Sequence, residues 1–224
     1  MPFPILETLR QALLTLRFRP RQWLVAFSPM LALEFAALVW SEYALPLRLL
    51  AMPLAIPCAC AWHRNLIAGE SVRIRWGRAE WLFLKTSLMV GLLSLLPMLL
   101  TAVAMTQLGE EITWKHHILF LVTFFVITWI TLPTVLTLPA NALGHDPTSK
   151  DFAKLVAPHR LRLSALLMAL PLTDAMISLL LSPLDSWAHY IDTMLRLIFW
   201  PLGVSVLSLA YIWVSHSSAK DHAE

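Results

Sequence analysis

The stretch PCACAWHRNLIAGE holds the densest group of chemically useful side chains in the chain. Cys58 and Cys60 are followed closely by Trp62, His63 and Arg64. Thiolates and imidazoles are the ligands that zinc and haem use, so a metal or haem site is one interpretation. An indole beside basic groups at the end of an apolar run is also typical of a membrane border. The stretch is therefore either a cofactor site or an anchor.

Helix geometry weighs against the cofactor site. Side chains two positions apart on a helix point about 200° away from each other. Cys58 and Cys60 can then neither form a disulfide nor easily bind one ion, and we interpret them as small packing residues. No metal and no cofactor is expected.

The alternative is that this stretch ends a membrane span. We expect the span to stop at Trp62, with its indole as an anchor and His63 and Arg64 at the cytoplasmic border. Gly69 would form a turn, and Glu70 could pair with Arg64 or with a loop arginine to fix it. An exposed pair of this kind contributes only about 0–1 kcal/mol.

Composition indicates the elements that position these residues. The chain has 224 residues, of which 58% are hydrophobic and 14% charged. A helix needs roughly 20 apolar residues to cross a bilayer, and helices satisfy their own backbone groups in lipid. We expect an all-α polytopic membrane protein with a cytoplasmic arm (1–21), a tail (216–224) and six transmembrane helices in a domain over 22–215, at about 22–43, 45–62, 81–106, 117–140, 161–181 and 190–215.

The basic residues predict the orientation. Of the 17 lysines and arginines, only Arg48, Lys115 and Arg196 fall on one side of the expected spans. By the positive-inside rule, both termini are then cytoplasmic. Membrane lipids are expected partners and nucleic acid is not. The basic side chains expected to face anionic head groups are Arg17, Arg19, Arg21, Arg73, Arg75, Arg78, Lys150, Lys154, Arg160 and Arg162.

Amphipathic segments precede the first, third and fifth spans, and we expect them to lie in the head-group plane. In the arm, apolar residues recur at helical spacing at Ile5, Leu9, Leu13 and Leu16. Prolines occur in or beside every span. In lipid, each proline leaves a carbonyl for a neighbouring group to satisfy, which suits a bent bundle or a cavity.

Ionisable residues inside the spans are Glu34 and Asp174. A charge at this depth is costly and suggests a function. The two carboxyls could carry protons or bind a cation in a shared cavity. A neutral pair bonded to backbone freed by a proline explains them as well.

The remaining candidates for chemistry are weaker. Histidines lie at span borders and lack a partner at matched depth for haem. The motifs of metalloproteases, serine hydrolases and nucleotide-binding loops are absent, and the connections are short. His145 and Asp146 could act in hydrolysis, although an aspartate before Pro147 more often caps a turn. We expect no enzymatic activity.

Several short motifs resemble a family of uncharacterised proteobacterial integral membrane proteins. They are CAWHRNLIAGE, RWGRAEWLFL, LTLPANALGHDPTSKDFAKL and LSLAYIWV. This family is distantly similar to YciC-like proteins and to the membrane domain of some glycerophosphodiester phosphodiesterases. The resemblance implies six spans, basic cytoplasmic loops and the bacterial inner membrane. It implies no reaction, and it leaves the roles of Asn141 and His145 open.

Two functions remain from these observations. The first is a non-enzymatic accessory or assembly subunit of a larger membrane complex, acting through helix and lipid contacts with other membrane subunits. Tryptophans at the span borders would anchor it or present flat surfaces to neighbours. The second is a small transporter or lipid-handling protein with a cavity lined by Glu34 and Asp174.

Overall fold

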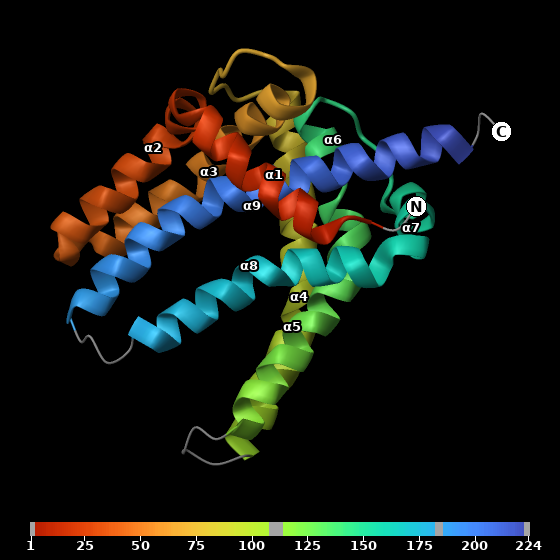
Figure 1. Ribbon diagram of the computed structural model, residues 1–224. Coiled ribbons are helices and arrows are strands. Elements are labelled where there is room, and N and C mark those ends of the chain that lie inside the picture. Colours follow the sequence, from red (N-terminus) through yellow and green to blue (C-terminus); the bar gives the residue numbers. More distant parts are fainter. Residues whose placement is uncertain (1–2, 108–113, 182–185, 222–224) are drawn as a thin grey trace.

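A computed structural model describes residues 3–107, 114–181 and 186–221 (Figure 1), although several side chains of α5, α8 and α9 lie outside this description. Every regular element in these ranges is a helix, as predicted. The helices are α1 (Ile5–Phe18), α2 (Pro20–Val39), η1 (Ser41–Tyr43), α3 (Ala44–Ala68), α4 (Arg78–Gln107), α5 (Trp114–Val135), α6 (Leu138–Ala142), α7 (Ser149–Val156), η2 (Ala157–His159), α8 (Arg160–Leu181) and α9 (Ser186–Asp221).

Five stretches of helix are long and apolar enough to cross a membrane. They are Pro20–Val39, Ser41–Ala68, Arg78–Gln107, Ile118–Ala142 and Leu197–His216, which correspond to five of the six expected spans. The remaining expected span, at 161–181, coincides with α8 but is not among the five, and part of α8 lies outside the described side chains. The protein is therefore a helical membrane protein, and the sixth span stays a prediction.

The second span is longer than the sequence predicts. It was expected to stop at Trp62, but α3 continues to Ala68 and ends at Gly69, whose φ of 69° is the left-handed conformation that favours glycine. Because the helix runs on for more than a turn, Trp62, His63 and Arg64 lie within it and not at its end. They are buried inside the protein.

The fourth expected span is divided near its C-terminal end. α5 ends at Val135, and the short α6 follows after a turn. Pro133 cannot donate to the carbonyl four residues before it, which belongs to Trp129. Arg160 donates to this carbonyl from Nη2 at 2.6 Å and from Nε at 3.2 Å. Its guanidinium also lies 4.8 Å from the centroid of the Trp129 ring.

Two of the three expected amphipathic segments are helices. In α1, Ile5, Leu9 and Leu16 pack on the protein core, whereas Leu13 is exposed. This apolar face contacts α9. α7 begins with a capping box between Thr148 and Asp151. The segment before α4, residues 69–76, has no helix. Placement of any of them in the head-group plane stays a prediction.

The helices form two groups that diverge (Figure 1). α1, α2, α3, α8 and α9 pack together, while α4 and α5 run side by side and extend away from them. The core lies around α9, where Val206 and Ala210 are buried with Trp62 and Leu132. From residue 84 to residue 100, by contrast, α4 has no buried residue. The α4/α5 hairpin is attached to the rest of the protein through contacts of α4 with α3 and α6 and of α5 with α7 and α8.

Candidate functional site

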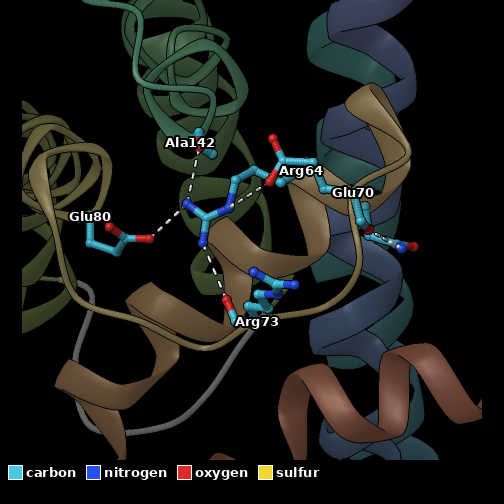
Figure 2. A network of polar contacts seen from close by, with 6 residues as sticks. Arg64, Glu70, Arg73, Glu80 and Ala142 are labelled. Atoms are coloured by element: carbon cyan, nitrogen blue, oxygen red, sulfur yellow. Dashed lines mark hydrogen bonds and ion pairs between the residues drawn. The ribbon is translucent and has the colours of Figure 1, made fainter.

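Arg64 is the centre of a buried polar network at the base of the α4/α5 hairpin. Its Nη1 donates to Glu80 Oε1 at 2.7 Å and to the carbonyl of Ala142 at 3.2 Å, and its Nη2 donates to the carbonyl of Arg73 at 3.4 Å. Figure 2 shows the guanidinium between these three groups, which come from α4, α6 and the 69–76 loop. We call this set the Arg64 network.

Burial makes the Arg64 network more consequential than a surface ion pair. The side chains of Arg64 and Glu80 are 5% and 1% exposed. Taking either charge out of water alone would cost several kcal/mol, so each group depends on the other. The network therefore joins α3, α4, α6 and the 69–76 loop at one point.

Glu70, the carboxylate expected to pair with Arg64, makes a weaker contact. Its Oε2 lies 4.0 Å from Arg64 Nε, and its side chain is about half exposed. The backbone does more to hold the turn, since Asn65 Nδ2 donates to the carbonyl of Glu70 at 2.7 Å. Arg19 Nη1 in turn donates to Asn65 Oδ1 at 3.4 Å. The turn at Gly69 is as predicted, but its side-chain partner is chiefly Asn65.

Two matched glycine substitutions test this turn. We expect Gly69→Ala to lower the free energy of unfolding by about 1–2 kcal/mol, because a Cβ is unfavourable at positive φ. Nothing lies within 4 Å of a Cβ at Gly69 or at Gly91. Gly91 lies within α4, so Gly91→Ala is expected to raise the free energy of unfolding by up to about 1 kcal/mol.

Denaturant titration of both purified variants, followed by circular dichroism, measures these changes. Equal effects of the two substitutions would contradict the assignment of Gly69 as a left-handed cap.

Two serines on α9 bind the two aromatic side chains that precede Arg64. Trp62 Nε1 donates to Ser205 Oγ at 2.8 Å, and His63 Nδ1 lies 2.7 Å from Ser208 Oγ. Each serine hydroxyl also donates to the carbonyl four residues earlier in its own helix, that of Pro201 or Val204. α3 and α9 are therefore joined by two buried hydrogen bonds.

This arrangement favours one tautomer of His63. When the hydroxyl proton of Ser208 is donated to the Val204 carbonyl, Ser208 accepts from the ring, and Nδ1 carries the proton. In the neutral imidazole, Nε2 is then an unprotonated acceptor. It is buried and has no hydrogen-bond partner. Buried polar atoms without a partner are rare, which makes this nitrogen a candidate for binding.

A cavity of about 690 Å³ lies beside His63. Among its described lining residues, the polar side chains are those of His63 and Ser87, together with the indole of Trp200. The volume is within the range of small-molecule sites, which are mostly apolar with a few polar groups. The lining residues are Met52, Ala55, Ile56, Ala59 and His63 of α3, Phe83 and Ser87 of α4, Leu138, Leu167, and Phe199, Trp200, Gly203, Val204 and Leu207 of α9.

Glu34, the first of the expected intramembrane carboxylates, is not among these lining residues. Its Oε2 lies 3.5 Å from Nε of Arg48 on the neighbouring helix α3, and the carboxylate side chain is 25% exposed. Asp174 belongs to α8, but its side chain lies outside the described residues. The cavity that the structure describes thus differs from the one expected between these two residues.

The other predicted residues are placed as follows. Cys58 and Cys60 are buried free thiols in two different apolar clusters, in agreement with their divergent directions. No group of three potential metal ligands occurs among the described residues. His145 and Asp146 are exposed. Of the ten basic residues expected to face lipid, all but Arg160 have exposed side chains, and Arg160 is half-buried against Trp129.

Sequence reasoning did not find Glu80, Ser205 or Ser208. Glu80 is next to Trp81 at the start of a span, where acidic residues commonly occur. The serines resemble the small residues of any membrane helix. Asn141, whose role was open, donates from Nδ2 to Thr86 Oγ1 at 2.7 Å and so joins α6 to α4.

Comparison with known proteins adds no relative. No family model, no curated protein and no solved structure matches this chain.

Proposed function

We propose that the protein is a non-enzymatic, lipid-handling protein of the bacterial inner membrane, with six spans and both termini in the cytoplasm. The observation that carries this proposal is the apolar cavity between α3, α4 and α9, whose wall includes His63, a residue that has one buried nitrogen without a partner. Met52 and Trp200 line it and are exposed, so it opens on a surface that lipid chains would reach.

The shape of the protein supports binding from the side. The α4/α5 hairpin diverges from the bundle (Figure 1), and the cavity is lined by α4 on one side and by α3, α6, α8 and α9 on the other. A lipid acyl chain that enters between these helices would exchange its lipid neighbours for protein side chains of similar polarity. The affinity would then come from packing and from the few polar groups in the wall.

Filling the cavity tests the proposal. Ala55 is buried and lines the cavity, and we expect Ala55→Phe to reduce lipid retained by the gently purified protein roughly tenfold, which corresponds to about 1.4 kcal/mol. Native mass spectrometry of the full chain measures bound lipid directly. Leu92→Phe is the matched control, because Leu92 is 68% exposed and is not a lining residue. Equal lipid retention by the parent and both variants would refute the proposal.

The second candidate function is the accessory or assembly subunit. It is favoured by the α4/α5 hairpin, whose apolar outer surface is uncovered along residues 84–100 of α4. The helices of another membrane protein would cover it. The same gentle preparation distinguishes the two candidate functions. An accessory subunit should be purified with a stoichiometric protein partner, and the Leu92→Asn variant should lose that partner. A monodisperse protein with lipid but no such partner contradicts it.

A further inference from the structure

We infer that the cavity binds a neutral lipid whose polar end is a hydroxyl that donates a hydrogen bond to His63 Nε2. The inference rests on the proposed function, because it names the class of lipid that the cavity would hold. Candidates of this chemical class are long-chain alcohols and acylglycerols with a free hydroxyl.

The direction of the hydrogen bond follows from His63 itself. In the tautomer that donates from Nδ1 to Ser208, Nε2 offers a lone pair and no proton. A ligand must therefore supply the donor. An ether or ester oxygen has no proton to give, whereas a hydroxyl does.

The charges near His63 favour a neutral ligand over an anionic one. None of the described residues that line the cavity is charged. The nearest cation in sequence is Arg64, and its donors are already directed at Glu80, Ala142 and Arg73. A phosphate or carboxylate in this cavity would be removed from water with no charged side chain among the described lining residues to compensate it, which costs several kcal/mol.

The placement of His63 also suits a lipid lying along the bilayer normal. On α3 the lining residues run from Met52 to His63, which is about 16 Å at 1.5 Å per residue. His63 is close to the end of α3 that the positive-inside rule puts at the cytoplasm. The hydroxyl would then lie near the head-group region, and the chain would extend toward the middle of the membrane.

Three single-chain probes of equal length test the inference on the full-length protein in detergent. They are 1-hexadecanol, its methyl ether and hexadecyl phosphate, compared at equal mole fractions in the micelle by native mass spectrometry. We expect the alcohol to bind roughly tenfold more tightly than the ether, as one hydrogen bond to a buried acceptor predicts. Hexadecyl phosphate should bind more weakly than the alcohol. In His63→Phe, the alcohol should lose its advantage over the ether.

The outcomes separate this inference from the proposed function. If all three probes bind the parent equally and Ala55→Phe weakens all of them, the cavity holds chains but His63 does not select a hydroxyl, and the inference is wrong. If no probe binds the parent, and Ala55→Phe does not change retained lipid, the proposed function is wrong as well. The comparison of alcohol with ether uses the parent protein, so it tests the inference even if His63→Phe fails to fold. A Soret absorption band would instead assign Nε2 to haem and overturn the inference.

Discussion

Replacing Glu80 by glutamine is expected to lower the free energy of unfolding by about 3–5 kcal/mol, the usual cost of leaving one charge of a buried pair uncompensated. Arg64 would remain buried at 5% exposure, with two carbonyls and the distant, half-exposed carboxylate of Glu70 as its partners. Denaturation of the purified protein in mixed micelles, followed by circular dichroism, measures the change.

Two further variants isolate the cause. Glu7→Gln removes one member of an exposed pair with Arg10, with N and O atoms 3.4 Å apart, and should cost at most about 1 kcal/mol. The double replacement Arg64→Met with Glu80→Leu removes both buried charges, so it should recover much of the loss from Glu80→Gln. A Glu80→Gln protein as stable as Glu7→Gln would contradict the buried Arg64 network.

The second large effect is expected at Trp62. Its side chain is fully buried in the main core and donates to Ser205. Trp62→Ala should therefore lower the free energy of unfolding by about 3–5 kcal/mol, through lost contacts and the cavity left behind. Trp62→Phe keeps most of the volume and loses the Nε1 donor, so its effect should be nearer 1 kcal/mol. The same denaturation assay measures both.

Trp40 is the natural control for this prediction, because it lies at the end of α2 and is 56% exposed. Trp40→Ala should change the free energy of unfolding by about 0.5 kcal/mol or less. If Trp62→Ala behaved like Trp40→Ala, the border-anchor interpretation of Trp62 would be correct after all.

The sequence could predict the helical membrane class because length and apolar runs determine it, and five long apolar helices confirm it. It also predicted the turn at Gly69 and the separation of the two cysteines, since both depend on local backbone geometry. It placed the end of the helix at Trp62, whereas α3 runs on to Ala68 and the side chains of Trp62, His63 and Arg64 are buried. Hydropathy falls at His63 and Arg64 whether these groups meet water or are buried with partners, so the pattern alone indicated a span end.

Whether Trp62, His63 and Arg64 meet water or are buried depends on partners that are distant in the sequence. Glu80 lies 16 residues from Arg64. Ser205 and Ser208 lie 143 and 145 residues from Trp62 and His63. No periodicity within one helix can connect such positions, because the contact depends on how α3 packs against α4 and α9. The cavity was missed for the same reason, since its wall is assembled from helices at both ends of the chain.

The separation of Trp62 and His63 from their serine partners also sets an order of events during synthesis. α3 is made long before α9, so the indole and imidazole must wait in the membrane without Ser205 and Ser208. The α3–α9 hydrogen bonds can form only after the last helix has been inserted. A nascent chain halted before α9 would therefore keep two unsatisfied polar side chains in its second span.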